Sequence, residues 1–201
     1  SLNSQSRLPL FPLSTVLFPR GKLPLRIFEP RYLDLIKRCM RENTGFGILH
    51  LENGSEVVSN SVNRSVLCSK MGTEVRIIDF DQIEGNLLGI LVEGFRRFQV
   101  GSSWEEADHL VVGEVEYLDE EPYYELGEGE ASLVRILKDV VRHPMVEKLN
   151  LELDYSNGVD VSYRLAELLP LDPAIKQSLL ELGDTGERLS NLKDLVNAFQ
   201  K

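Results

Sequence analysis

The residues best suited to binding chemistry lie together in one short segment, Phe28-Glu29-Pro30-Arg31-Tyr32. It combines a carboxylate, a guanidinium and two aromatic rings, and its proline favours the start of a helix at this point. A helix start offers backbone N–H groups and a positive dipole end, so the segment could hold a peptide backbone or a chain terminus. Alternatively, Phe28 and Tyr32 are core anchors, while Glu29 and Arg31 make local bonds at the helix start. The sequence leaves both interpretations open.

Other reactive residue types occur without the neighbours that catalysis or metal binding needs. The three histidines lie at positions 50, 109 and 143, and none has a second ligand at a metal-binding spacing. Cys39 and Cys68 form no C-x-x-C motif, which favours reduced thiols and a cytoplasmic location, and Cys39 is expected in the core. Neither a phosphate-binding G-x-x-x-x-G-K-[ST] loop nor a G-x-S-x-G motif is present. We therefore expect no catalytic residues, no metal and no cofactor.

The charge of the chain argues against two classes of partner. Its 22 basic and 32 acidic residues give a formal net charge of −10, which disfavours nucleic acid and anionic membranes. Residues 1–117 hold 13 basic and 15 acidic groups, whereas residues 118–201 hold 9 and 17. The run Phe95-Arg96-Arg97-Phe98 is too small for a basic patch, and strand alternation predicts that Phe95 and Arg97 share one face. No apolar run approaches the ~18 residues that a membrane-spanning helix needs.

Proline spacing and apolar periodicity predict a β-rich first part. Five prolines between Leu8 and Tyr32 exclude a regular helix there and predict short extended pieces. A helix is expected over Arg31–Glu42, and a bend or bulge at Gly94. The expected strands are Phe46–Leu51, Ser65–Leu67, Glu74–Phe80, Leu87–Val92, Arg96–Gly101 and Val111–Tyr117. This pattern is typical of a strongly bent sheet or a small open barrel.

The period becomes helical after an acidic, glycine-bearing stretch, Asp119–Glu130. We interpret that stretch as a solvated linker, with a specific acidic binding motif as the alternative. Helices are then expected from Ala131 to Val141 and over Asp160–Leu169, Asp172–Leu182 and Asp184–Phe199. The prediction is an α+β chain with a β-rich lobe over 7–118, a linker over 119–130 and an all-helical lobe over 131–201.

Three blocks of the sequence carry a family resemblance. They are LPLFPL–VLFP–LPLRIFEPRY at the amino end, Gly72-Thr73-Glu74 leading into EGNLLGILVEGFRRFQV, and SYRLAELLPLDPAIKQSLLELGDTGERLSNLKDLV near the carboxyl end. In this order they resemble the amino-terminal, substrate-binding domain of the Lon protease family. The resemblance implies a PUA-like pseudo-barrel followed by helices. It also implies a stand-alone member of the family without the ATPase and Ser–Lys protease modules, and therefore without enzymatic activity.

The resemblance implies a protein that binds other polypeptides. Unfolded or partly folded chains are the expected partners, and Phe28, Glu29, Pro30, Arg31 and Tyr32 are the candidate peptide-binding residues. One alternative is an adaptor for a single folded protein, for a Lon-type protease acting in trans or for a second copy of the chain. Another is an enzyme with an unrecognised small-molecule site, which predicts a deep polar pocket with converging titratable groups.

Overall fold

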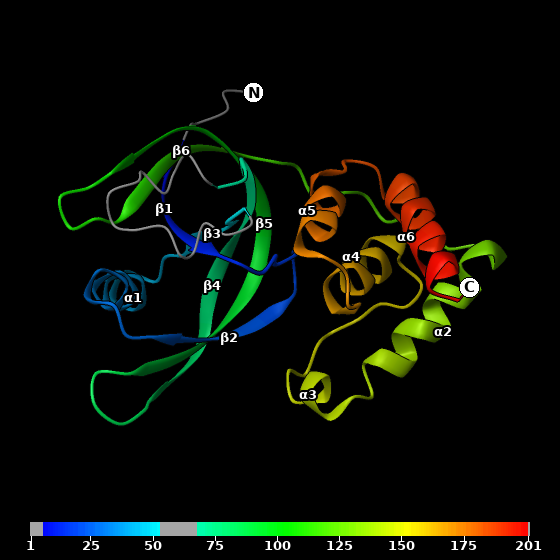
Figure 1. Cartoon of the computed structure of the whole chain (residues 1–201), viewed down its shortest axis with the longest axis horizontal. Coiled ribbons are helices and arrows are strands. Elements are labelled where there is room, and N and C mark those ends of the chain that lie inside the picture. The colour runs from blue at the N-terminus through cyan, green and yellow to red at the C-terminus, as the bar shows by residue number, and fades with distance from the viewer. Residues whose placement is uncertain (1–5, 53–67, 201) are drawn as a thin grey trace. The chain divides into compact units, whose positions relative to one another are not determined.

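The computed structural model describes residues 6–52 and 68–200. The chain divides into two compact units, unit 1 (Ser1–Asp119) and unit 2 (Glu120–Lys201). Figure 1 shows that strands dominate the first and helices the second, which establishes the mixed α+β class. The strand expected over Ser65–Leu67 lies outside the described residues.

Unit 1 is built on a six-stranded sheet with one long helix, α1 (Pro30–Glu42). The strand order is β2-β5-β4-β3-β1-β6, and β6 also pairs with β5, so that five of the strands close into a ring. The strands are β1 (Ser6–Leu13), β2 (Lys22–Ile27), β3 (Phe46–His50), β4 (Met71–Gln82), β5 (Leu88–Glu105) and β6 (Val111–Tyr117).

The proline-rich segment forms β1 and β2, as the exclusion of helix predicts. In β1, residues 6–10 pair with β6, whereas residues 10–13 pair with β3. Over residues 6–52 and 68–200, Pro9 and Pro12 therefore each lie in a half of β1 that has a neighbouring strand on one side only. A proline lacks the N–H that a second neighbour would need, so this arrangement tolerates both. In β2, Pro24 lies on a strand that, among the residues that the structure describes, pairs with β5 alone.

The strand β5 is longer than the sequence pattern predicts. The two strands expected on either side of Gly94 are one continuous strand, because Gly94 bends the chain without ending it. The register to β4 shifts between Gly94 and Arg96, so Phe95 is the extra residue of a β-bulge. Phe95 is exposed whereas Arg97 is buried, so the prediction that these two share a face is wrong. An added Cβ at Gly94 would lie 2.4 Å from the carbonyl oxygen of Phe18, which explains the glycine.

Unit 1 has two buried apolar clusters, one of which lies between α1 and the sheet (Figure 1). The buried face of α1 presents Tyr32, Leu35, Ile36 and Cys39, as its apolar spacing predicts. Pro30 is its first residue and Asn43, in the left-handed conformation (φ 53°), ends it. The opposing side chains come from β1, β3, β4 and β5, including Phe11, Phe46, Ile48, Val75, Ile90 and Val92.

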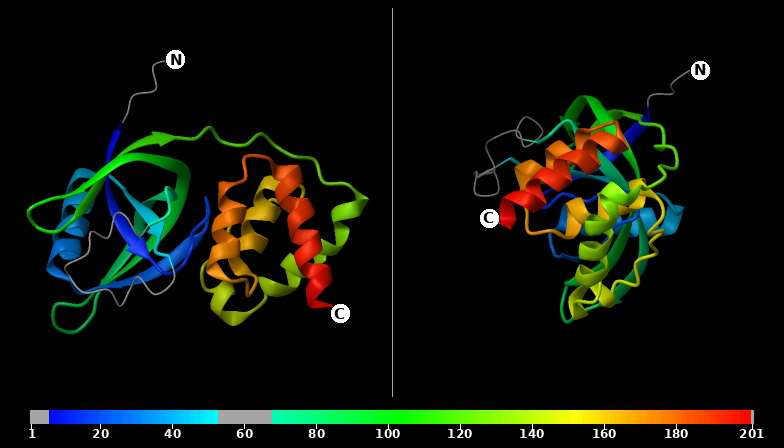
Figure 2. Two further views of the ribbon diagram at one scale, coloured as in Figure 1. Left: turned by 45° about the horizontal axis from the view of Figure 1, so that its top comes forward. Right: turned by 90° about the vertical axis from the view of Figure 1, so that its right-hand side faces the viewer.

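The described elements of unit 2 are helices. They are α2 (Ala131–Val140), α3 (Pro144–Glu147), α4 (Gly158–Leu168), α5 (Pro173–Glu181) and α6 (Thr185–Phe199), after a 3₁₀ turn, η3 (Glu128–Glu130). The helix α4 packs against α2, α5 and α6 and is buried from Gly158 to Ala166. Figure 2 shows α5 and α6 side by side. The side chain of Asp184 caps α6 by accepting a hydrogen bond from Glu187 N at 2.9 Å.

The acidic stretch 119–130 contributes a buried residue to unit 2. The side chain of Glu121 is 5% exposed and its carboxylate accepts a hydrogen bond from Arg188 Nη2 at 2.7 Å. It also accepts from the Thr185 hydroxyl at 2.8 Å and from the Tyr163 hydroxyl. Further along, Glu130 Oε1 lies 3.2 Å from Lys193 Nζ. Residues of the expected linker thus hold α6 in place.

Candidate binding surfaces of unit 1

Two residues of the predicted peptide-binding segment bind each other. Glu29 precedes α1 as its N-cap residue, and its Oε2 atom lies 3.0 Å from Arg31 Nε and 2.9 Å from Arg31 Nη2. The third guanidinium nitrogen, Nη1, donates to the carbonyl of His109 at 2.9 Å. Arg31 thereby ties the start of α1 to the loop between β5 and β6. These contacts agree with the local-bond alternative for Glu29 and Arg31.

The two aromatic residues of the segment have opposite environments. Tyr32 is 6% exposed, and its ring centroid lies 4.1 Å from that of Phe11 in the core. Phe28 is 66% exposed and follows the last residue of β2. The five residues therefore do not converge on one site. Phe28 is the aromatic side chain of the segment that reaches solvent, next to the exposed Pro30, and a peptide-contact role for the segment stays a prediction.

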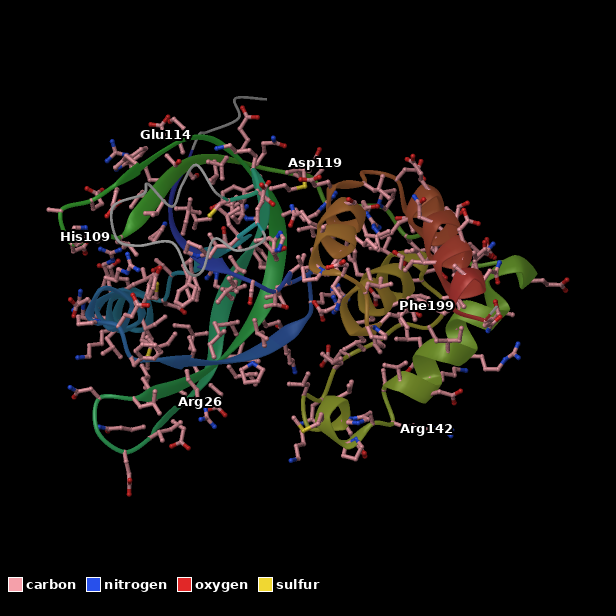
Figure 3. All side chains as sticks on the ribbon, viewed as in Figure 1. Arg26, His109, Glu114, Asp119, Arg142 and Phe199 are labelled. Atoms are coloured by element: carbon pink, nitrogen blue, oxygen red, sulfur yellow. The ribbon has the colours of Figure 1, made fainter. Side chains whose placement is uncertain are left out.

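A shallow groove of about 510 Å³ crosses β2, β5 and β4, and Phe28 directly follows β2. Leu25 of β2 and Phe80 of β4 lie on either side of Ile90 of β5, because both residues pair with Ile90. Phe80 is 58% exposed, and Gly89, which pairs with Arg26 and Asp81, leaves the middle strand without a side chain at the next position. We call this the β2–β5–β4 groove; its lining is Pro24, Leu25, Arg26, Asp79, Phe80, Asp81, Ile83, Gly89, Ile90 and Leu91. Figure 3 labels Arg26 on β2.

A second pocket, of about 340 Å³, is strongly charged. It is lined by four arginines, two glutamates and six other residues from β1, α1, β4, β5 and β6, and we call it the arginine pocket. Its base is the buried carboxylate of Glu74, which lies 3.4 Å from Arg96 Nε and 3.7 Å from Arg76 Nε. The lining is Arg7, Leu8, Pro9, Arg38, Cys39, Glu42, Thr44, Gly45, Glu74, Arg76, Arg96 and Tyr117. Sequence reasoning missed it, because the residues come from five separate elements.

Two titratable groups of the arginine pocket, Cys39 and Tyr117, have raised pKa values. Burial raises the pKa of the Cys39 thiol, whereas a nucleophilic cysteine needs a lowered pKa. Burial, together with the hydrogen bond to Glu74, raises the pKa of Tyr117 to about 12, so this hydroxyl stays protonated. Both groups are poor nucleophiles and poor bases at neutral pH. The lining carries two more arginines than glutamates.

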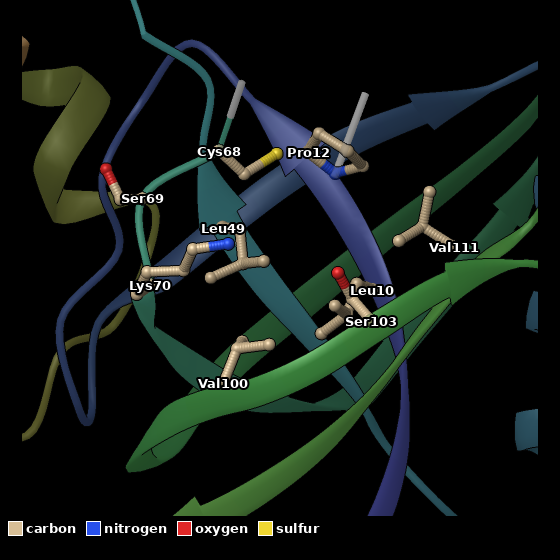
Figure 4. Close-up of a pocket in the computed structure, with 9 residues that line it drawn as sticks. All are labelled: Leu10, Pro12, Leu49, Cys68, Ser69, Lys70, Val100, Ser103 and Val111. Atoms are coloured by element: carbon tan, nitrogen blue, oxygen red, sulfur yellow. The ribbon is translucent and has the colours of Figure 1, made fainter. Parts of the chain in front are cut away.

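A small cavity lies beside Cys68 (Figure 4). Its volume of about 10 Å³ is near the minimum for one water molecule, so it has no room for a substrate. Over residues 6–52 and 68–200, no group of three or more His, Cys, Asp or Glu side chains is placed to hold a metal ion. In the same ranges, none of the helices combines the length and apolar character of a membrane span.

The comparison with known proteins decides the family. The family model of the ATP-dependent protease La (LON) substrate-binding domain matches residues 7–198. The chain belongs to this family. Its LON domain is 25% identical to Lon protease 2 of Myxococcus xanthus over 198 residues, which are 94% of this chain but 23% of that protein. The 201 residues thus hold the substrate-binding domain and not the ATPase and protease domains.

Further relatives support the assignment. A LON peptidase N-terminal domain and RING finger protein of Schizosaccharomyces pombe is 25% identical, over 92% of this chain and 44% of that protein. The crystal structure of a Lon N-terminal domain protein from Xanthomonas campestris has 35% identity and a TM-score of 0.76, covering 94% of this chain and 98% of that one. The N-terminal domain of a Mycobacterium avium complex Lon protease, at 18% identity and a TM-score of 0.61, shares the fold. The resemblance drawn from the sequence is confirmed.

Proposed function

We propose that this LON domain is a non-catalytic module that binds unfolded or hydrophobic polypeptide segments. The observation that carries the proposal is the β2–β5–β4 groove, which is lined by Phe80, together with Phe28, two residues beyond the lining residue Arg26; both phenylalanines are more than half exposed. Exposed apolar side chains beside a groove are typical of interaction surfaces, because water contact costs free energy that a partner recovers. Of the five segment residues, Phe28 contacts the polypeptide, while Glu29, Pro30, Arg31 and Tyr32 hold it in position.

The backbone of β2 adds a second means of attachment. Within the described residues β2 pairs with β5 alone, so its other edge can accept an extended segment as an added strand. Pro24 lacks an N–H, which limits that ladder and keeps the interaction short. An unfolded segment also loses conformational entropy when it is ordered, so micromolar or weaker affinity is expected.

A relative of different domain content supports a recognition role. The Schizosaccharomyces pombe protein is named for a LON domain and a RING finger, which indicates that the domain serves outside the Lon protease itself. We also propose that the β-rich lobe is PUA-like and covers residues 7–118, and that a linker over 119–130 joins it to the helical lobe over 131–201. The proposed location is the cytoplasm, and neither nucleic acid nor a membrane is a proposed partner.

The test is a binding titration with the whole chain and a fluorescently labelled, reduced and alkylated ribonuclease, which stays unfolded. Phe28→Ala and Phe80→Ala should each weaken binding about tenfold, because burying a phenylalanine contributes ~1.5–3 kcal/mol. Phe199→Ala is the matched control, since Phe199 is 62% exposed on α6 of unit 2 (Figure 3). It should leave the affinity unchanged.

The same titration distinguishes the other interpretations. Equal affinity for the native, folded ribonuclease would contradict recognition of unfolded segments. Retained binding in both phenylalanine variants would overturn the assignment to the groove. If no unfolded polypeptide binds and one folded protein or a second copy of the chain does, the adaptor alternative replaces the proposal.

A further inference from the structure

The arginine pocket concentrates positive charge on a unit that is slightly acidic overall. Residues 1–117 carry two more acidic than basic groups, yet the pocket lining has four arginines and two glutamates. Arg7 stands opposite Glu114 in the β1–β6 register, which offsets one of these charges. The remaining three arginines come from α1, β4 and β5. Because like charges repel, three arginine side chains lie this close together only if other groups hold them in place.

The buried Glu74 provides that arrangement. Its side chain is 4% exposed, and its two carboxylate oxygens face the Nε atoms of Arg76 and Arg96. A buried carboxylate is stable only when paired, so Glu74 fixes both guanidiniums at the base of the pocket. The side chains of Arg76 and Arg96 are 45% and 42% exposed, so both arginines also reach solvent. Glu74 is therefore a positioning residue.

Aromatic rings fix the orientation of these guanidiniums. Arg96 Cζ lies 3.4 Å from the ring centroid of Tyr117 and 5.3 Å from that of Phe95. Arg76 Cζ lies 5.6 Å from the same Phe95 ring. A stacked guanidinium loses little further entropy when it forms two parallel hydrogen bonds to a carboxylate. The bulge that exposes Phe95 thus serves this pocket.

We propose that the arginine pocket binds a carboxylate of a polypeptide, either its terminal carboxylate or an Asp or Glu side chain. Arg96 and Arg76 hold the two oxygens from the base, and Arg38 closes the site from α1. The volume of about 340 Å³ is that of a small-ligand pocket, which suits one or two residues of a chain. The inference depends on the proposed function only for the source of the carboxylate, since the β2–β5–β4 groove shares no lining residue with this pocket.

The test compares three acetylated Gly/Ser/Ala hexapeptides by isothermal titration with the whole chain. One ends in a free carboxylate, one in an amide, and one in an amide but with a single internal Asp. A carboxylate peptide should bind at least tenfold more tightly than the neutral amide, because each charged hydrogen bond contributes ~1.5–3 kcal/mol. The stronger of the two carboxylate peptides identifies the source. The ring centroid of Trp104, the one tryptophan of the chain, lies 5.4 Å from Cζ of the pocket residue Arg7. Its fluorescence should therefore report peptide binding in the arginine pocket.

Variants locate the binding. Arg96→Gln should weaken the carboxylate peptide at least tenfold, and Arg38→Gln should weaken it severalfold while leaving the partners of Glu74 in place. Arg142→Gln changes an exposed arginine that follows α2 (Figure 3) and should have no effect. Equal binding of the neutral amide, an equal effect of Arg142→Gln, or tighter binding of a single-stranded oligonucleotide would each overturn the proposal. Phe28→Ala and Phe80→Ala should not alter these titrations, so failure here and failure of the proposed function are separate results.

Discussion

The buried ion pair of unit 2 provides the sharpest test of the structure. Replacing Glu121 by alanine leaves the fully buried guanidinium of Arg188 without its counter-charge. Removing one partner of a buried pair typically costs ~3–5 kcal/mol. Arg188 keeps hydrogen bonds to the carbonyls of Leu179 and Leu182, at 3.1 and 2.6 Å, and to a serine hydroxyl. These bonds reduce the penalty, so we expect a loss of about 3–4 kcal/mol in the free energy of unfolding.

Urea unfolding followed by far-ultraviolet circular dichroism measures the loss, because unit 2 holds most of the helices. With a urea dependence near ~1.5 kcal/mol/M, the midpoint should fall by about 2 M. Glu130→Ala is the matched control, since Glu130 also pairs with a cation of α6 but Lys193 is 34% exposed. It should cost about 1 kcal/mol or less. Equal losses in the two variants, or a loss under ~1 kcal/mol for Glu121→Ala, would refute the assignment of a buried pair.

The same pair makes unit 2 sensitive to acid. Burial alone would raise the pKa of Glu121, but hydrogen bonds from Arg188, Tyr163 and Thr185 and the Arg188 charge lower its pKa below the ordinary value. The stabilisation is present above the unfolded carboxyl pKa of ~4.3 and is lost as the pH falls through the lowered folded value. The stability difference between wild type and Glu121→Ala should therefore shrink below about pH 4. A difference that stays constant into strong acid would contradict the assigned ionisation.

Three further outcomes concern unit 1. Gly94→Ala should lower the free energy of unfolding in urea by about 2–3 kcal/mol, because the new Cβ would lie 2.4 Å from the Phe18 carbonyl oxygen. Gly183→Ala is the control and should change that free energy little, because a Cβ there would meet nothing within 4 Å. Ultraviolet absorbance should show a tyrosine with a pKa of about 12 in the wild type, and this titration step should be missing in Tyr117→Phe. The Cys39 thiol should alkylate slowly in the native state and quickly in urea, since burial both covers it and raises its pKa; mass spectrometry of the labelled peptide compares the two states.

The features that the sequence predicted well depend on near neighbours. The helix expected over Arg31–Glu42 is α1, and the helix expected over Asp172–Leu182 is α5; both begin with a proline, whose effect on helix formation is local. The family assignment also came from local blocks of sequence. Such signals require no knowledge of how strands or units pack.

The features that the sequence did not predict depend on distant partners. The burial of Arg97 follows from a bulge whose register is set against β4, so alternation within β5 alone gave the wrong face. The role of Glu121 requires Arg188, which lies 67 positions further along. The charge of Glu121 and its place in the acidic stretch 119–130 suggested that its side chain is exposed to solvent. The arginine pocket likewise exists only once five elements are in place, and no spacing in the sequence encodes it.

The closure of the sheet sets the order in which unit 1 can form. The first strand pairs with the last, Ser6 opposite Val115, so the ring cannot close until almost the whole unit has been synthesised. Contacts between residues so far apart slow folding, because a long loop must be ordered before they stabilise it. During synthesis, the proline-rich β1 therefore leaves the ribosome well before its partner β6. The prolines at positions 9 and 12 then have a second consequence, since an unpaired strand that lacks these donors is a poor template for aggregation.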